Sequence, residues 1–537
     1  MPPDAQSLRD WRRHLPTGAP DPWPLVADDD GLTRCWREHW LEQPDAVALV
    51  GLTAETETSY SRADLDARSA AAAQLLHERG VRRGDRVLFS GAASASYLFL
   101  YVGALRLGAV IVPANTGYTA PELAHIVTDS GAVLAVVDDP QRIAGELPVV
   151  VPASVELDAA AAEADAAGTP PLDEATARDL AMIAYTSGTT GRPKGAMLSH
   201  GNLLASARAV TIAWRWTAGD GLVLALPLFH MHGLGVGIHG SLTSGGRILL
   251  LPGFKPEPVA AACARADATL LFGVPTMHKR LLEHAEVDTA ARAALASLRL
   301  VVSGSAPLSG ELWERVHAVT GQRIVERYGM TETVMNISNP YEGERRPGTV
   351  GIPLPGVEVR LDGGGDGDGD SGEILVRGEN VFAGYWQREA ATAESFTDDG
   401  WFRTGDVGQR SPDGYVSIVG RSKELIISGG YNVYPREVEE VLESHPGIHE
   451  AAVVGGPSEE WGEVVTAFLV HAADAAPPSA DELADLTSTR LAGYKRPRAY
   501  HVLERLPRNA MGKLERGRLV ELLGGAHAAV VGHRPTL

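Results

Sequence analysis

Ten consecutive residues, 186–195, combine hydroxyl side chains, glycines and two cations in a pattern that suits phosphate binding. The stretch reads TSGTTGRPKG and follows an apolar, strand-like run, AMIAY. Glycine amides and hydroxyls donate hydrogen bonds to phosphate oxygens, and a lysine adds positive charge beside them. A plain surface loop rich in Ser, Thr and Gly is the alternative that composition alone leaves open. The residues predicted to contact phosphate are Thr186, Ser187, Gly188, Thr189, Thr190 and Lys194.

This stretch departs from the Walker A loop. Counted from Gly188, the second Walker glycine would fall on Pro193, and Lys194 is followed by Gly195 instead of Ser or Thr. The sequence therefore predicts a polyphosphate loop of a different kind.

The same stretch resembles the signature of the adenylate-forming superfamily, which includes acyl-CoA synthetases, luciferases and peptide-synthetase adenylation domains. The resemblance spans Asp45 to about Leu523, and further family-like motifs follow in the expected order. It implies an α/β fold: a large N-terminal domain of parallel and mixed sheets with helices, followed by a small, mobile α+β domain. The further motifs are PLFHMHG from Pro227, SGSAP from Ser303, ERYGMTET from Glu326, GTVGIP from Gly348, WFRTGD from Trp401, GRSKELI from Gly420, GGYNVYPREVE from Gly429 and PRNAMGK from Pro507.

The resemblance implies that the chain binds ATP, Mg²⁺ and coenzyme A. In adenylation a carboxylate attacks the α-phosphate of ATP while pyrophosphate leaves, so the site must neutralise charge and orient the acid. By resemblance Tyr328 packs on adenine, Thr331 bonds the α-phosphate, Glu332 holds Mg²⁺, and Asp406 and Arg421 bind the ribose hydroxyls. The other residues predicted to bind the nucleotide are Ser305, Ala306, Glu326, Arg327, Gly329 and Met330.

Lys513 resembles the mobile lysine of the family, which bridges the carboxylate and the α-phosphate during adenylation. With Thr186, Glu332 and His230 it forms the predicted catalytic set. Lys423 stands at the family's hinge, about which the small domain rotates for thioester formation. His230 stands where the family has a gating residue between the acyl pocket and the CoA tunnel; a structural histidine is the alternative.

Arg280 indicates which acid is activated. It lies in LFGVPTMHKRLLEH, from Leu271, and this stretch together with residues 326–351 resembles malonyl-CoA synthetases. In those enzymes the arginine at this position binds the free carboxylate of malonate. A buried carboxylate needs such a partner, and arginine offers it a two-pronged fork. His232 and Ser303 are the other predicted substrate-binding residues, and a solvated cation on a helix is the alternative for Arg280.

The sequence thus predicts an ATP-dependent, AMP-forming acid–CoA ligase for a small dicarboxylate, malonate or methylmalonate. A first alternative is an adenylating enzyme that takes another small acid or a carrier protein as acceptor. A second is a catalytically inactive, nucleotide-binding regulatory protein.

These residues must be positioned by elements that the apolar patterning predicts. Residues 61–80 show helical spacing, and residues 86–90 and 132–137 are β-rich runs. Helices that alternate with such strands favour parallel sheets covered by helices. A change of pattern after Gly420 predicts a large domain of residues 1–420, a hinge at 421–423 and a lid domain of residues 424–537. Residues 1–43 contain no assigned motif, and their Trp and Arg side chains are expected to pack on the large domain.

Composition excludes other classes of protein. With 48 Lys and Arg against 68 Asp and Glu, the formal charge of −20 disfavours nucleic-acid binding. The most apolar stretch, residues 97–113, contains Arg106 and is shorter than the roughly 20 residues of a membrane span, so it predicts a buried helix followed by a strand. Two cysteines make no disulfide framework, and no secretory signal opens the chain. A cytoplasmic protein without a membrane partner is expected.

Overall fold

The computed structural model describes most of the 537 residues. The ranges are 11–19, 22, 24–143, 145, 147–155, 157, 170–186, 193–363, 370–421, 424–428, 431–458, 461–473, 475–509, 513–524 and 530–531. Ser187, Gly188, Thr189, Thr190 and the predicted hinge residue Lys423 lie outside them.

The largest sheet has nine strands in the order β15-β14-β13-β12-β11-β9-β10-β1-β2. The strands from β13 to β1 run parallel, and antiparallel strands close both edges. The strands are β1 (Val47–Leu52), β2 (Glu57–Ser61), β9 (Gly221–Leu224), β10 (Arg247–Leu250), β11 (Leu270–Gly273), β12 (Leu300–Ser303), β13 (Val325–Tyr328), β14 (Ile337–Ser338) and β15 (Ile352–Pro353).

A second sheet has six strands in the order β6-β5-β3-β4-β7-β8. Its strands are parallel except for the β7–β8 hairpin, which brackets the predicted phosphate loop. The strands are β3 (Arg86–Ser90), β4 (Val110–Pro113), β5 (Ala132–Val137), β6 (Val149–Val150), β7 (Leu180–Thr186) and β8 (Lys194–Ser199).

Two further sheets follow along the chain. An antiparallel sheet contains β16 (Val357–Asp362), β17 (Asp370–Gly378), β18 (Phe402–Arg410) and β19 (Val416–Arg421). The C-terminal sheet is mixed and contains β20 (Ile426–Ser428), β21 (Tyr431–Val433), β22 (Ile448–Ser458), β23 (Gly462–His471), β24 (Ala499–Val502) and β25 (Val530–Val531).

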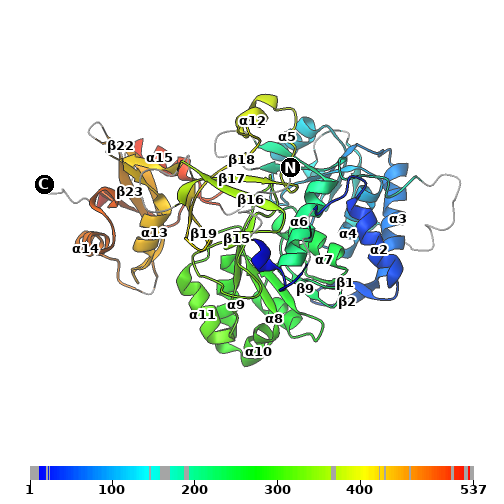
Figure 1. Cartoon of the computed structure of the whole chain (residues 1–537), viewed down its shortest axis with the longest axis horizontal. Helices are drawn as coiled ribbons and strands as arrows, with labels where there is room; N and C mark the ends of the chain where they lie inside the picture. The colour runs from blue at the N-terminus through cyan, green and yellow to red at the C-terminus, as the bar shows by residue number, and fades with distance from the viewer. Residues whose placement is uncertain are drawn as a thin grey trace.

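Helices cover the sheets, and Figure 1 shows α13 to α15 beside the C-terminal sheet, apart from the larger body of the molecule. Buried apolar side chains from Leu25 to Val416 and those from Ile426 to Leu519 form separate clusters. The helices are α2 (Leu32–Glu42), α3 (Arg62–Glu78), α4 (Ala95–Arg106), α5 (Ala120–Ser130), α6 (His200–Ala213), α7 (His239–Ser244), α8 (Pro256–Cys263), α9 (Pro275–Val287), α10 (Thr289–Ser297), α11 (Gly310–Thr320), α12 (Glu389–Glu394), α13 (Pro435–Glu443), α14 (Ala480–Arg490) and α15 (Arg516–Gly524).

The elements predicted from apolar patterning are confirmed. Helix α3 lies within the predicted range of 61–80 and begins after Ser61 because Ser61 and Asp64 cap its first turn reciprocally. Strands β3 and β5 occupy 86–90 and 132–137. The apolar run 97–113 forms α4 from its third residue onward, followed by β4. Arg106 is tolerated there because it forms ion pairs with Asp66 at 2.8 Å and Asp173 at 3.0 Å. Within the described ranges, every helix is too short or too polar to cross a bilayer.

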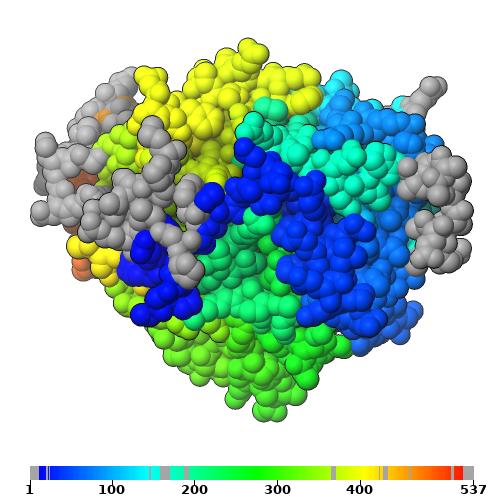
Figure 2. Space-filling view, turned by 45° about the vertical axis from the view of Figure 1, so that its right-hand side comes forward, coloured from blue at the N-terminus to red at the C-terminus, as the bar shows by residue number. Residues whose placement is uncertain are grey.

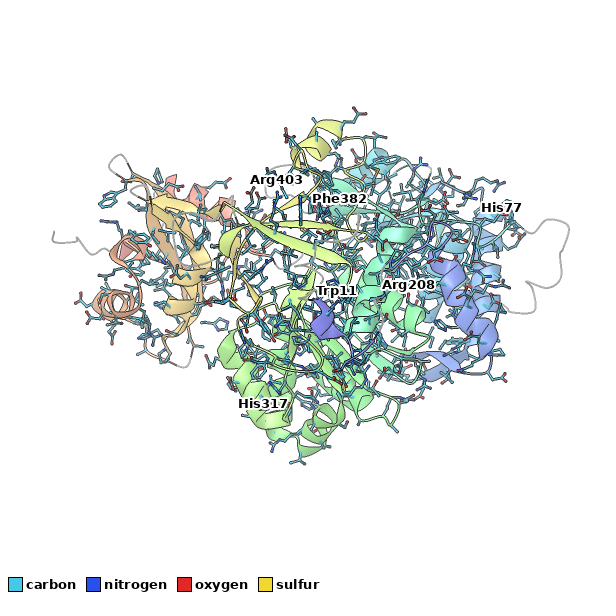
Figure 3. All side chains as sticks on the ribbon, viewed as in Figure 1. Trp11, His77, Arg208, His317, Phe382 and Arg403 are labelled. Atoms are coloured by element: carbon cyan, nitrogen blue, oxygen red, sulfur yellow. The ribbon has the colours of Figure 1, made fainter. Side chains whose placement is uncertain are left out.

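The N-terminal segment packs on the large body, as its Trp and Arg side chains predict. Trp11 is only 1% exposed, and Arg13 donates a hydrogen bond of 2.8 Å to the carbonyl of Asp413. Figure 2 shows this dark-blue segment crossing the face made by the green middle of the chain, and Figure 3 places Trp11 near its centre.

Candidate active site

The parallel strands of the large sheet end at a cavity of about 2260 Å³. Ligands of open α/β sheets commonly bind beyond the carboxyl ends of the strands. Residues that follow β9, β11, β12 and β13 line this cavity, and residues beyond Gly420 line its opposite wall. The predicted site residues on its walls are Thr186, Lys194, His230, His232, Ser305, Ala306, Glu326, Arg327, Tyr328, Gly329, Met330, Thr331, Glu332, Asp406, Arg421 and Lys513.

Strands β7 and β8 bring the two described ends of the predicted phosphate loop together. Thr186 pairs with Lys194 in the antiparallel register. The ammonium of Lys194 lies 5.2 Å from the centre of the Tyr385 ring. The backbone of Trp386 donates a hydrogen bond of 2.8 Å to the carbonyl of Gly195. The segment around Tyr385 is therefore fixed against the phosphate-loop strands.

Glu332 is buried on the wall of the cavity. Burial raises the pKa of its carboxyl group, and a 2.9 Å hydrogen bond from the Tyr385 phenol opposes that rise. Sequence reasoning missed Tyr385, because a tyrosine between Gly384 and Trp386 is not distinguished from a core aromatic by its type. Only its position between Lys194 and Glu332 reveals it.

Tyr328 and Arg421 both contact the carboxylate of Asp406. The Tyr328 phenol donates to Asp406 Oδ2 at 2.5 Å, and Arg421 Nε lies 2.9 Å from Oδ1. Asp406 and Arg421 face each other on neighbouring strands β18 and β19. Asp406 is the main reason why the pKa of Arg421 is raised. The residues predicted for adenine and ribose thus form one connected cluster.

Lys513 faces this cluster from the C-terminal part of the chain. Its side chain is exposed to the cavity, yet the surrounding protein lowers its pKa, first by desolvation and then through Arg421. Glu332 and Asp406 act on it in the opposite direction. Burial, and then Lys513, lower the pKa of His230 to about 4, so His230 is neutral near pH 7. Lys513 therefore acts electrostatically on His230 and is itself influenced by Glu332, so it connects three of the four predicted catalytic residues.

A second polar cluster lies around Arg327, which lines the same cavity. This guanidinium is 5% exposed, and among the described residues Nε and one terminal nitrogen have no hydrogen-bond acceptor. Burial lowers its pKa to about 9. It packs so closely on Gly304 that a Cβ there would lie 2.4 Å from the guanidinium carbon. His232 Nδ1 lies 3.4 Å from Ser305 Oγ, whereas His232 Nε2 and the Ser303 hydroxyl have no partner in the described part of the chain.

The structure does not bring Arg280 into the wall of the cavity. Arg280 is exposed on α9, and its guanidinium lies 5.1 Å from the centre of the Phe254 ring. Phe254 and Met277, one turn before Arg280, do line the cavity. Ser303 is fully buried at the end of β12, beside the wall but not in it.

Comparison with known proteins agrees with this arrangement. Residues 36–386 match the model of AMP-binding enzymes, and residues 437–513 match the model of the AMP-binding enzyme C-terminal domain. The chain belongs to the family of AMP-binding enzymes.

Relatives of this AMP-binding enzyme include proteins named for different acids. This chain is 39% identical over 475 residues to a feruloyl-CoA synthase of Amycolatopsis sp, and the aligned region covers 87% of this chain and 94% of the relative. ATP-bound MatB from Rhodopseudomonas palustris superposes with a TM-score of 0.82 at 38% identity, covering 92% of this chain and 99% of that one. A malonyl-CoA ligase with methylmalonyl-CoA and AMP bound superposes with a TM-score of 0.63 at 42% identity, covering 90% and 100%.

These likenesses confirm the predicted superfamily, its closeness to malonyl-CoA synthetases and the fold with a large N-terminal and a small C-terminal domain. The protein is an AMP-forming acid–thiol ligase. ATP and CoA are substrates of its family.

Proposed function

We propose that this AMP-binding enzyme joins a small dicarboxylic acid, malonate or a 2-substituted relative such as methylmalonate, to CoA through an acyl-adenylate. The observation that supports this substrate class is the Arg327 guanidinium, buried on the cavity wall without an acceptor among the described residues. A buried charge without a partner is costly, and a substrate carboxylate would supply that partner. His232, whose Nε2 has no partner among the described residues, adds hydrogen-bonding capacity on the same wall, whereas the buried Ser303 does not line it.

In this proposal the two polar clusters bind different substrates, one ATP and the other the carboxylic acid. The cluster of Tyr328, Asp406 and Arg421 binds the nucleoside of ATP, and the Arg327 cluster binds the free carboxylate of the acid. The reacting carboxylate then lies between them, facing Lys513 and His230. Arg327 thus binds the acid substrate in this proposal, whereas the resemblance predicts that it binds the nucleotide. Arg280, which is exposed, does not contact the substrate carboxylate in this proposal.

Glu332 fits the magnesium role predicted for it. Mg²⁺ in such sites is commonly held by one or two carboxylates together with substrate phosphates. Glu332 presents a buried carboxylate on the same cavity as Lys194 and Thr186. When bound, the ion would neutralise phosphate charge, while Lys194 and Lys513 provide the protein's own positive charge.

The C-terminal domain acts as a lid in this proposal. It comprises residues 424–537, moves about a hinge at 421–423 and contributes Lys513 to adenylation. Its rotation about Lys423 would replace Lys513 by the face that receives the CoA thiol.

A hydroxycinnamic acid is the second candidate substrate, because the feruloyl-CoA synthase relative is as similar as the malonyl-type enzymes. Such an aromatic acid would leave Arg327 without an anionic partner. Malonate is therefore the better fit to the described cavity.

The test is pyrophosphate release measured with malonate, methylmalonate, acetate, ferulate and succinate, each with and without CoA. We expect release with malonate or methylmalonate, and formation of the CoA thioester and AMP only when CoA is present. A preference for ferulate or acetate would overturn the assignment of a dicarboxylate substrate, while the assignment of the protein as an AMP-forming ligase would stand. Adenylation without transfer to CoA would indicate a carrier protein as acceptor, and no release with any acid would indicate a regulatory nucleotide-binding protein.

A further inference from the structure

Residues 507–509 and 513–515 pair as two antiparallel arms, and Lys513 is the first residue of the second arm. We call these two arms the Lys513 hairpin; residues 510–512 lie outside the described ranges. The amide of Asn509 donates to the carbonyl of Lys513 at 2.9 Å, and the amide of Lys513 donates to Asn509 Oδ1 at 3.0 Å. Glu515 donates its amide to the carbonyl of Pro507 at 2.9 Å. The two arms of the hairpin are therefore hydrogen-bonded to each other, and the orientation of the hairpin depends on the contacts at its base.

Arg516 follows this base directly and begins α15. Its Nε donates to Glu424 Oε2 at 2.9 Å, and its two terminal nitrogens bond Glu439 on α13. One of them also donates to the carbonyl of Val453 on β22 at 3.1 Å. The guanidinium therefore ties the base of the hairpin to three separate segments of the C-terminal domain.

The contacts of Arg516 with Glu439 join two largely buried side chains. The side chain of Glu439 is 3% exposed and that of Arg516 is 19% exposed. Glu439 also accepts a 2.8 Å hydrogen bond from the amide of Val453, so its position is fixed from two sides. Only the planar fork of arginine can reach two carboxylates and a carbonyl at once; a lysine offers a single point charge. Glu424 is the first described residue after Arg421, so the same side chain connects the hairpin to the start of the lid.

We propose that Arg516 is a positioning residue that holds the Lys513 hairpin in the adenylation site through its contacts with Glu439 and Glu424. The proposal rests on the adenylation role assigned to Lys513 under the proposed function. It predicts that Arg516 matters for the first half-reaction and not for the second. It also predicts an effect on the hairpin that needs no substrate.

The first experiment measures amide hydrogen exchange in the full-length protein without ligands. In Arg516→Met we expect the peptide covering residues 507–515 to exchange about tenfold faster or more. Arg496→Met is the matched control, because Arg496 lies in the same domain and bonds only backbone carbonyls, those of Leu491 and Ser488, in the contacts described. Unchanged exchange at 507–515 in Arg516→Met would overturn the proposal, whatever the acid substrate proves to be.

The second experiment separates the half-reactions. Arg516→Met should slow single-turnover pyrophosphate release by about 30-fold or more, with thioester formation from added acyl-adenylate within about threefold of the unchanged protein. In a Lys513→Ala background the same substitution should cause no further loss of adenylation, since both act through one group. Equal loss in both half-reactions, or undiminished loss in the Lys513→Ala background, would contradict the assignment.

Arg516→Met removes the nearer cation from the buried Glu439 and leaves Arg436, whose Nη1 lies 4.0 Å from Glu439 Oε2, so a third variant controls for instability. In Arg516→Met with Glu439→Gln the buried charge at position 439 is gone, and the side-chain carbonyl oxygen introduced there can still accept the hydrogen bond from the backbone N–H of Val453. We expect the melting temperature to recover while adenylation stays low. Recovery of both would show a purely structural role and overturn the proposal. Arg516→Lys should fall between Arg516→Met and the unchanged protein in adenylation.

Discussion

The phenol of Tyr385 donates a hydrogen bond of 2.9 Å to Glu332, and its ring lies 5.2 Å from the ammonium of Lys194. One side chain thus contacts both the predicted metal carboxylate and the predicted phosphate lysine. The backbone around Tyr385 pairs with Ala196 on β8, so the contact links the phosphate-loop hairpin to the loop after β13.

Tyr385→Phe removes the hydrogen bond and keeps the ring. Hydrogen bonds to charged groups contribute about 1.5 to 3 kcal/mol. We therefore expect the Mg²⁺ concentration for half-maximal pyrophosphate release to rise about tenfold or more, with KM for ATP at saturating Mg²⁺ within about threefold. Tyr385→Leu, which also removes the ring, should raise that KM further. Tyr415→Phe is the matched control, because its phenol bonds the carbonyl of Glu344 and does not line the cavity; an equal effect there would contradict the assignment.

Arg327→Met tests the carboxylate pocket, and Arg280→Met is its comparator. Loss of the partner of a buried charge costs about 3 to 5 kcal/mol, so we expect kcat/KM for malonate to fall about 100-fold or more in Arg327→Met. Because Arg280 is exposed, its loss should lower kcat/KM less than about fivefold. Steady-state kinetics with malonate at saturating ATP measure both. A larger loss of kcat/KM in Arg280→Met than in Arg327→Met would instead indicate that Arg280 binds the free carboxylate of malonate, as the sequence predicts.

Lys513→Ala should block adenylation and leave conversion of added acyl-adenylate to thioester nearly unchanged. The lysine lies among Asp406, Glu332 and Arg421, where charge on the α-phosphate would gather. We expect single-turnover pyrophosphate release to fall about 100-fold or more, the order of effect seen when a group that stabilises transition-state charge is removed. Loss of both half-reactions to the same extent would remove this role.

Glu326 predicts a pH dependence of stability. Burial raises its pKa from 4.5 to about 7. The folded chain then holds this proton more tightly than the unfolded chain, so the contribution of Glu326 is complete below about pH 4.5 and is lost as the pH rises through about 7. Relative to Glu326→Gln, the free energy of unfolding should fall by roughly 3 kcal/mol over that window, since one pKa unit is about 1.4 kcal/mol. Denaturant titrations of the unchanged protein and Glu326→Gln at several pH values measure this.

The local elements followed from the sequence, because capping residues and apolar periodicity act over a few neighbouring positions. Ser61 and Asp64 cap the start of α3, and the β-rich run RVLFS in residues 86–90 is enough to indicate β3. The motifs around Lys194, Glu332, Asp406 and Lys513 also predicted that distant segments share one cavity, and the structure brings these four residues to it.

Side-chain partners could not be predicted in the same way, because they depend on distances between segments far apart in the chain. Arg280 and Arg327 are both arginines near family motifs, and nothing in their sequence neighbourhoods says which one is buried. Packing of β13 against Gly304 hides Arg327, whereas the helical phase of α9 turns Arg280 outward. Tyr385 and Arg516 gain their roles from three-dimensional contacts alone. The sequence by itself determined the chemistry of ATP-dependent acid activation, and the tertiary structure decided which charges are desolvated and therefore in need of a ligand.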